Sequence, residues 1–560
     1  MTNGSHTQVS VSSTTGPNPS LQMLALEAIS AGVVSLFQVA FRSVSNFALE
    51  HSECTLAGSP SGTSQQKLTF HLSKAADLAT DLYLEVKCPT LESGDGSGSP
   101  ITCLATYVWG LGYAMISHAQ FLVSNHSQED LNGDYMELYD ELHGIPGKRF
   151  EEAIFKYDNV TLPELAALSA QGPTLYIPIP FWWTKGTHAA LPIISLNCYD
   201  MDVVVHLRPI NEIYVALTDT MAVQSTAGTS PHLKIGGNAS TVALDWSQFQ
   251  FSMWMGSVFL DTAERNTFAN TDHSYVMKTV QSYTSYASDQ GHTVNEKSTA
   301  LNNVSFQHPT SALIWTLADP HRRASKHTQH SNGDGTPYTA GVRSLYGTIA
   351  SVSTGGNNTV LGRAEGLTDF NVLREGHRRL SYINDAGLAA DLSALGSAAA
   401  GGEDSSAGLL SSAAVKVWRR DGLNNCLHLP GNRFDYRMAA SGKEIEPLDK
   451  FMLTFNSNDR VHSSLSGEHY RQVQGQHFNN IPRKGIYAYS FAMNGSSPFP
   501  QGSVNLSRVD TINITIDKHA DYPVASNDVA GAGVGSELLL YSEHFNIWKV
   551  TKNSVGKTFG

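Results

Sequence analysis

The chain of 560 residues is too long for one comfortable hydrophobic core, so its length predicts two domains with insertions. Apolar residues make up 41% of the sequence and charged residues only 16%, which excludes an intrinsically disordered protein. The formal net charge of −13 argues against a surface whose main task is to bind nucleic-acid phosphates. The cysteines form no CxxC pair and indicate a reducing compartment rather than a disulfide framework: Cys54, Cys88, Cys103, Cys198 and Cys426.

Residues 1–36 are predicted to form an N-terminal arm. The chain starts without the basic segment that opens a secretory signal. The apolar stretch 23–40 contains Glu27 and Gln38 and is barely long enough to cross a bilayer. A packed or peripheral helix is therefore the preferred interpretation of that stretch.

A first β domain is predicted over residues 37–260. Residues 67–72 and 80–87 read as strands, and 80–87 alternates cleanly between apolar and polar side chains. A further strand-like run covers 101–123, and the aromatic, apolar strand 249–260 closes the domain. Runs rich in Gly, Ser and Pro supply the turns between these strands.

Residues 175–207 are the most informative part of this domain, because they are aromatic and apolar yet contain three prolines. Pro178 and Pro180 lie two residues apart, so their missing N–H groups face the same edge of an extended chain. That edge cannot carry a full set of hydrogen bonds. The segment is therefore expected at a sheet margin, or paired through its other side.

The second part of this segment is predicted to be strand in two phases. Ile194, Leu196 and Cys198 share one face of an extended chain, whereas residues 201–207 place their apolar side chains at odd numbers. A one-residue change of phase moves every side chain to the other face. A bulge or sharp bend is therefore expected near residues 199–200.

A linking helix is predicted over residues 261–272, between the two domains. Asp261 followed by Glu264 matches the capping-box pattern that opens a helix. The second β domain is predicted over residues 273–560, with a strand at 311–318. It also contains a long insertion rich in Gly, Ser and Ala at about 321–415, expected to be a surface elaboration.

The segment 485–517 repeats the order of features found at 175–207. Each has an aromatic strand, a loop containing proline and a long alternating strand that carries an acid, Asp202 or Asp510. This repetition predicts structural duplication of the two halves. Two all-β domains of about eight strands each indicate tandem jelly rolls.

Two local patterns in the first half resemble binding sites. Trp182 and Trp183 are typical of a ligand platform, but adjacent aromatic residues more often pack in a core or an interface, here near the junction of the two domains. Asp200, Asp202 and His206 have the spacing of metal ligands. The sequence shows no fourth metal ligand. The preferred interpretation is therefore that these residues lie on a solvated face or form salt bridges at an interface.

Three patterns in the second half also resemble functional sites, and for each a structural interpretation is preferred. A basic cluster is expected to be a solvated loop, with subunit contact as the second choice: His321, Arg322, Arg323, Lys326, His327 and His330. The sequence Asn332-Gly-Asp-Gly lacks the remaining acids of a calcium loop and is read as a turn. Gly556-Lys-Thr resembles the end of a phosphate-binding loop, but no helix follows it. No catalytic, cofactor-binding or metal-binding residue is assigned, and neither enzyme activity nor a cofactor is predicted.

Several segments, in order along nearly the whole chain, resemble the major capsid proteins of the large nucleocytoplasmic DNA viruses. The most recognisable one in the first half is Ile177-Pro-Ile-Pro-Phe-Trp-Trp. The others are 41–50, 81–86, 190–196, 260–268, 306–309, 455–460, 481–492, 500–510 and 541–559. The family's Gly-Asn-Pro near the first strand is absent, positions 43 and 44 lack its usual Arg and His, and the insertion is longer than in compact members.

The resemblance implies two tandem eight-stranded jelly-roll barrels joined by a short helix, with long loop insertions. It further implies a homotrimeric, pseudo-hexagonal capsomer in the icosahedral capsid of a large DNA virus. The expected partners are copies of the chain, neighbouring capsomers, minor capsid and penton proteins, and an inner membrane near the N-terminal arm. Direct contact with nucleic acid is not expected. The location would be the virion, after synthesis and assembly in the host cytoplasm.

Two alternatives of other classes stay open at this point. The first is an assembly scaffold of the same double jelly-roll fold that is shed before the particle matures. The second is a glycan-binding jelly-roll protein, which would need a concave face with exposed aromatic residues and clustered acids.

Overall fold

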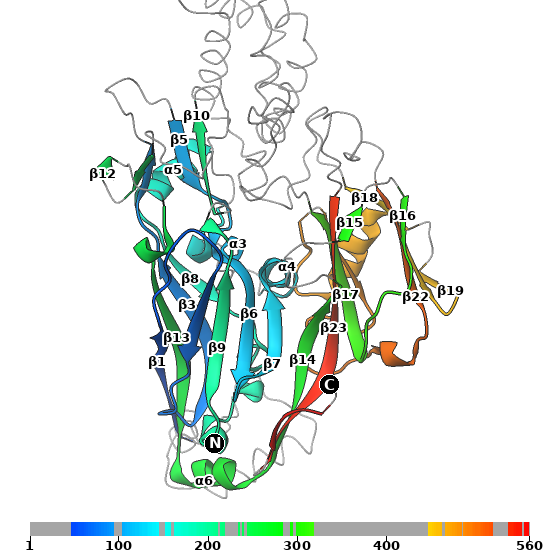
Figure 1. Ribbon diagram of the computed structural model, residues 1–560. Helices are drawn as coiled ribbons and strands as arrows, with labels where there is room; N and C mark the ends of the chain where they lie inside the picture. Colours follow the sequence, from blue (N-terminus) through cyan, green and yellow to red (C-terminus); the bar gives the residue numbers. More distant parts are fainter. Residues whose placement is uncertain are drawn as a thin grey trace, which may run out of the picture.

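The computed structural model shows two β-sheet units side by side, with short helices between and around the strands (Figure 1). Every strand pairing among the described residues is antiparallel, from β1 with β13 to β23 with β24. The structure describes residues 46–93, 103–144, 152–157, 162–210, 213–218, 233–235, 238–239, 244–283, 292–294, 298–318, 446–461, 465–483, 485–518, 536–551 and 554–558.

The first unit is built on an eight-stranded sheet with the order β7-β6-β9-β2-β1-β13-β3-β8. The strands are β1 (Phe47–Ala57), β2 (Gln66–His71), β3 (Leu78–Lys87), β6 (Ile116–Val123), β7 (His126–Asn132), β8 (Thr174–Pro178), β9 (Met201–Leu207) and β13 (Gln250–Leu260). Two small sheets accompany it, formed by β4 (Leu91–Ser93), β5 (Cys103–Tyr107), β10 (Tyr214–Thr218), β11 (Leu233–Ile235) and β12 (Asn238–Ala239).

The second unit contains the strand orders β14-β23-β17-β20 and β16-β22-β18-β19. Their bounds are β14 (His273–Ser282), β16 (Ser298–Leu301), β17 (Pro309–Ala318), β18 (Leu448–Phe455), β19 (Asn458–Val461), β20 (Ile486–Ser490), β22 (Ile512–Lys518) and β23 (Ser536–Thr551). Three short strands join the first of these sheets: β15 (His292–Val294), β21 (Val504–Asn505) and β24 (Ser554–Lys557).

The strand orders of the two units match. The order β1-β13-β3-β8 corresponds to β14-β23-β17-β20, and β2-β9-β6-β7 corresponds to β16-β22-β18-β19. The predicted repeat falls on equivalent positions, because β8 and β20 each end their sheet while β9 and β22 each lie inside one. The predicted duplication is therefore confirmed, and so is the sheet-margin position of the proline-containing strand.

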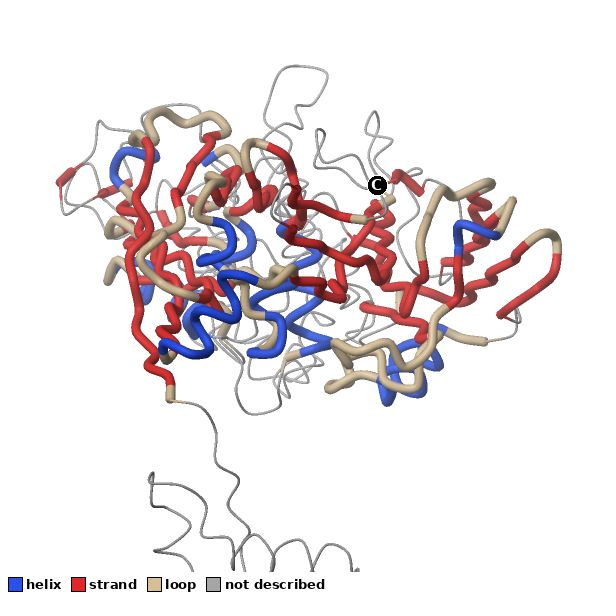
Figure 2. The backbone as a smooth tube through the Cα atoms, turned by 90° about the horizontal axis from the view of Figure 1, so that it is seen from below, coloured by secondary structure: helices blue, strands red, loops and turns tan. Residues whose placement is uncertain are grey.

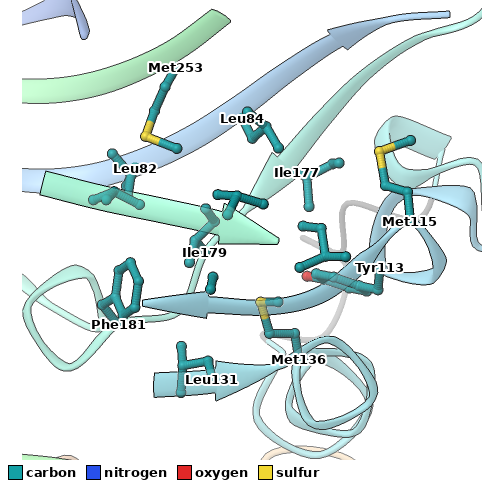
Figure 3. Close-up of a cluster of buried hydrophobic side chains, with 14 of the residues drawn as sticks. Leu82, Leu84, Tyr113, Met115, Leu131, Met136, Ile177, Ile179, Phe181 and Met253 are labelled. Atoms are coloured by element: carbon teal, nitrogen blue, oxygen red, sulfur yellow. The ribbon is translucent and has the colours of Figure 1, made fainter. Parts of the chain in front are cut away.

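The strands follow the alternation seen in the sequence. In β22 the side chains of Ile512, Ile514 and Ile516 are buried, and in β9 those at positions 201, 203, 205 and 207 are buried as predicted. Figure 3 shows the resulting core of the first unit, where Leu82 and Leu84 of β3 lie near Ile177 of β8 and Met253 of β13. Alternation builds these cores because successive side chains of a strand point to opposite faces.

The prediction of an alternating strand at Ile194, Leu196 and Cys198 is wrong. Trp182–Thr184, Thr187–Ala189 and Ile193–Leu196 form short 3₁₀ turns. Ile193 and Leu196, three residues apart, are buried, as one face of a helical turn requires, whereas Cys198 is exposed. The sharp bend expected near residues 199–200 is present, because the chain turns there before β9 begins.

The predicted linking helix is confirmed as α6 (Thr262–Asn270), whose first turn is capped by the Asp261 carboxylate. The described part of the chain contains three further α-helices that were not predicted: α3 (Leu111–Ala114), α4 (Gly133–His143) and α5 (Leu162–Ala170). A Cβ on Gly133 would lie 2.0 Å from the carbonyl oxygen of Ile116. Glycine at this position therefore allows α4 to start directly against β6.

The N-terminal arm 1–36 and the whole insertion 321–415, with its basic cluster 321–330 and Asn332, lie outside the described residues. Among the helices that the structure describes, none combines the length and apolar character needed to cross a bilayer. Cys54, Cys88 and Cys198 are free thiols. Burial raises the pKa of the Cys54 thiol to about 11, so this thiol stays protonated at neutral pH.

Candidate functional site, the seam between the two sheet units

The two sheet units meet along a buried surface that we call the seam. From the first unit it includes β7, α4 and residues 182–185, and from the second unit β14, β23 and residues 478–496. Figure 1 shows α4 and β7 next to β14 and β23, and Figure 2 shows the same two strand-rich units from below. The seam decides whether the two units act as one body.

Aromatic rings fill one part of the seam. The ring of Trp182 lies 5.0 Å from that of Trp548 and 5.6 Å from that of Tyr275, measured between ring centroids. The indole N–H of Trp548 donates a hydrogen bond of 3.1 Å to Gln128 of β7. The expectation that Trp182 packs near the junction is thereby confirmed. Trp183 instead packs on Phe121 inside the first unit.

Glu543 of β23 is the centre of a buried polar network in the seam. Its Oε1 atom accepts hydrogen bonds from the Tyr135 hydroxyl at 2.8 Å and from Nε2 of His143 at 2.7 Å. Its Oε2 atom lies 2.7 Å from Nζ of Lys278, on β14. Lys278 also donates to the carbonyl oxygen of Gly495. Side chains of α4 from the first unit and of β14 from the second unit therefore converge on one carboxylate of β23.

The network joins the Glu543 carboxylate to the side chains of Lys278 and His143. Burial would raise the pKa of Glu543, but His143 and Lys278 outweigh burial and hold this pKa well below its usual value. Burial lowers the pKa of His143 more than Glu543 raises it. A neutral His143 with its proton on Nε2 fits its partners, because Ser496 accepts from the Asn479 N–H and can donate to Nδ1 at 3.0 Å.

A second pair of charged groups lies nearby in the seam. Glu129 of β7 accepts a 2.7 Å hydrogen bond from the backbone N–H of Trp182. Lys185 donates to the carbonyl oxygen of Lys278 at 3.0 Å, and its ammonium lies 5.0 Å from the centre of the Tyr139 ring. Burial raises the pKa of Glu129 to about 7, although Lys185 and the Trp182 N–H act in the opposite direction. Burial also lowers the pKa of Lys185.

Glu129 should make the protein less stable as the pH rises. Its carboxyl titrates near 4.5 when unfolded and near 7 when folded, so the folded state holds the proton more tightly. The stability that this proton provides is complete below pH 4.5 and is lost as the pH rises through about 7. We expect Glu129→Gln to raise the free energy of unfolding at pH 8 by about 1–3 kcal/mol, with little change at pH 4.5. Urea unfolding at both pH values measures this, and exposed Glu50→Gln should show no such difference.

The end of α4 is capped by residues of the second unit. The side-chain amide of Asn479 donates to the carbonyl oxygen of His143 at 2.8 Å, and that of Asn480 donates to Gly144. The backbone N–H of Asn480 donates to the carbonyl oxygen of Leu142 at 3.2 Å. The last carbonyl groups of a helix have no partner within the helix. The second unit supplies these partners, and this ties the orientation of α4 to both units.

Asn480→Ala is expected to lower the free energy of unfolding by about 1 kcal/mol, because the Gly144 carbonyl loses its donor. Hydrogen exchange should become faster in the last turn of α4 while the strands of the first unit stay protected. Asn458→Ala provides the comparison, since that amide bonds the Asn456 carbonyl within an exposed turn. Equal exchange of α4 in both variants would contradict the capping role.

A further ion cluster flanks α4. Nζ of Lys156 lies 2.6 Å from Glu141 and 3.6 Å from Glu137, both on α4. Arg483 of the second unit also contacts Glu141 at 3.2 Å, and its guanidinium lies over the ring of Trp109 at 5.0 Å. The carboxylates of α4 are thus shared between cations of the two units.

The remaining candidate residues are not brought together as a site. Asp202 pairs with His71 at 2.6 Å, Asp200 pairs with Lys74 at 3.0 Å, and His206 stacks on His118. These partners agree with a face that carries salt bridges. No group of three or more His, Cys, Asp or Glu side chains able to hold a metal occurs in the part of the chain that the structure describes. Gly556 and Lys557 belong to β24, which pairs with β23 and is not a phosphate-binding loop.

Sequence reasoning missed the polar part of the seam. Glu543 stands in a run of apolar and aromatic strand residues, where a charge needs a buried partner. Asn132 and Gly144 are capping residues at the two ends of α4, with apolar residues at helical spacing between them. Both signals were present. The partners of Glu543 could not be identified from the sequence, because His143 and Glu543 are 400 residues apart in the chain.

Two sheet units with matching strand order, locked by aromatic rings and a shared carboxylate, define a structural building block of two fused β domains. Residues 264–556 match the family described as the large eukaryotic DNA virus major capsid protein, and residues 35–261 match the major capsid protein N-terminus. The chain belongs to this family of viral major capsid proteins. It is a structural protein of the virion capsid.

Three curated major capsid proteins match over 94% of this chain. The major capsid protein of Phaeocystis pouchetii virus is 25% identical, over 94% of this chain and 95% of the relative. The major capsid protein of Paramecium bursaria Chlorella virus 1 is 21% identical, over 94% of each protein. These names favour neither a shed assembly scaffold nor a glycan-binding protein.

Solved structures show the same fold. A chain from the PBCV-1 virus capsid has a TM-score of 0.56 at 17% identity and covers 94% of this chain and 100% of its own length. The Faustovirus major capsid protein has a TM-score of 0.52 at 9% identity, with 94% of both chains covered. The predicted all-β, double jelly-roll fold is thereby confirmed.

Proposed function

We propose that three copies of this chain assemble into a pseudo-hexagonal capsomer of an icosahedral capsid. The observation that carries this proposal is the pair of sheet units with matching strand order, joined by a buried seam. Three copies place six similar units around one axis, so threefold symmetry gives a nearly hexagonal outline. Closed symmetric assemblies are the usual outcome for such subunits.

The seam supports the capsomer by fixing the angle between the two units. An ion pair buried at Glu543 and Lys278 has a geometry that tolerates little movement, because separation would leave each charge without its partner. The Trp182 and Trp548 rings add packed apolar area on the same surface. A protomer held in this way presents one shape to its neighbours, as regular tiling requires.

The wider setting follows from the same proposal. We infer domains at 37–260 and 273–560 with a linking helix at 261–272. We also infer contacts with neighbouring capsomers, minor capsid proteins and penton proteins. The arm 1–36 would face an inner membrane, and the insertion at about 321–415 would project outward. Assembly would take place in the host cytoplasm. The net charge of −13 supports a shell without direct nucleic-acid contact, and the role proposed is structural rather than enzymatic.

The recombinant chain should elute as a stable trimer. Size-exclusion chromatography with light scattering should give a mass near three times 60.5 kDa. Negative-stain images of the same fraction should show particles with a hexagonal outline. A chain that stays monomeric at all concentrations would contradict the capsomer proposal.

A further inference from the structure

Large apolar side chains are exposed on two segments of the second unit, 473–483, which begins in short helical turns, and 491–501. The exposed fraction is 83% for Met493, 56% for Phe499, 53% for Ile481 and 48% for Val473. Half of the large hydrophobic residues that are exposed in the described part of the chain fall between residues 473 and 499; the others are Phe47, Leu49, Tyr176 and Val276. Clustered exposed apolar residues mark interaction surfaces more often than isolated ones do.

Hydrogen bonds hold the two segments together. The backbone N–H of Gly495 donates to the carbonyl oxygen of His477 at 2.7 Å, and a ring nitrogen of His477 lies 3.2 Å from the carbonyl oxygen of Met493. The Asn479 N–H donates to the Ser496 hydroxyl at 3.0 Å. Residues 473–483 and 491–501 therefore form one surface, which we call the apolar lip.

The composition of this segment is that of an interface core. Residues 473–503 contain only two charged side chains, Arg483 and Lys484, although charged residues make up 16% of the chain. Arg483 contacts Glu141 of the first unit. Depletion of charge together with exposed Met and aromatic side chains distinguishes the centre of protein interfaces from ordinary surface.

The apolar lip is continuous with the seam and is held in place by it. Lys278 donates to the carbonyl oxygen of Gly495, and His143 bonds Ser496 at 3.0 Å. The Phe499 ring lies 4.7 Å from that of His188, in the first unit. Both units of one protomer thus support the lip. A surface that is ordered before binding loses little conformational entropy when it is covered.

We propose that the apolar lip is a contact surface for a second copy of this chain within the capsomer. This inference rests on the trimer proposed above and names one of its interfaces. A threefold ring needs a heterologous contact, in which one surface of each copy meets a different surface of the next. The lip suits one side of such a contact because it is apolar, nearly uncharged and fixed to both units. In a shell built of identical subunits, the most abundant partner is another copy.

The test compares the full-length chain with Met493→Glu and Ile481→Glu by light scattering over a range of concentrations. A carboxylate in the covered lip would have to be desolvated without a partner, so the midpoint concentration for trimer dissociation should rise on the order of 10–100-fold. Met493→Ser should give a smaller rise. Leu49→Glu, at an exposed apolar residue of β1, is the matched control and should leave the trimer intact. Thermal unfolding checks that each variant is folded, as expected for exposed positions.

The outcomes separate the two proposals. If the wild-type chain fails to form a trimer, the proposed function fails with it. If the wild type and both glutamate variants form equally stable trimers, only the inference about the lip is wrong. The lip would then not contact a second copy within the trimer, and the proposed function would stand. An equal loss of the trimer in Leu49→Glu would also overturn it, since the effect would not depend on the lip.

Discussion

Replacing Glu543 with Gln is expected to lower the free energy of unfolding by about 3–5 kcal/mol, because the Lys278 ammonium would stay buried without its counter-charge. Gln keeps the shape of the side chain and can still accept from Tyr135 or His143. The loss therefore reports the missing charge rather than a cavity. Urea unfolding followed by circular dichroism measures it.

Two further variants make this result specific. The double substitution Glu543→Leu with Lys278→Met removes both charges and should recover most of the stability, since a buried pair is often replaceable by apolar residues of similar volume. Asp200→Asn breaks an exposed pair with Lys74 and should change the free energy by less than about 1 kcal/mol. A double variant no more stable than Glu543→Gln would contradict the interpretation as an uncompensated charge.

Trp182→Ala is expected to cost about 3–5 kcal/mol and to weaken the coupling between the two units. The substitution removes the ring that packs on Trp548 and Tyr275, so the loss falls on the seam. Differential scanning calorimetry should show the unfolding of the two units moving apart in temperature. Limited proteolysis should cut near α6 sooner than in the wild type.

Trp315→Ala is the matched control for this variant. Trp315 is fully buried and stacks on Phe451 at 4.0 Å, within the core of the second unit. Its loss should destabilise the second unit by a similar amount without exposing the seam. Equal proteolysis near α6 in both variants would show that general destabilisation, and not the seam, is the cause.

Alternation predicted the strands well where one face of the strand meets a core. The strands β3, β9 and β22 were found with the correct buried positions, because a period of two is fixed by the geometry of an extended chain. The same reasoning was wrong at Ile193–Leu196. Apolar residues there recur both at every second position, as in a strand, and three positions apart, as in a helical turn. The structure forms the helical turn, because this places Ile193 and Leu196 together against the rest of the unit.

Only the aromatic part of the seam could be predicted from the sequence. Trp182 was expected near the junction, and Trp548 is its partner from the other unit. The helix α4 was missed, although Asn132 caps its first turn and Gly144 follows its last residue. Its fixed orientation depends on Asn479 and Asn480, which no local pattern links to it.

By itself the sequence determined the all-β architecture, the linking helix and the duplication of the two halves, because these depend on local spacing of apolar residues, capping and the order of features. It also determined the family, through segments that keep their order along the chain. Only the tertiary structure decided that Glu543, His143 and Lys278 share one buried site and that the apolar lip stands on it. The physical reason is distance along the chain: these contacts join residues that only the packing of one sheet unit against the other brings within hydrogen-bonding range.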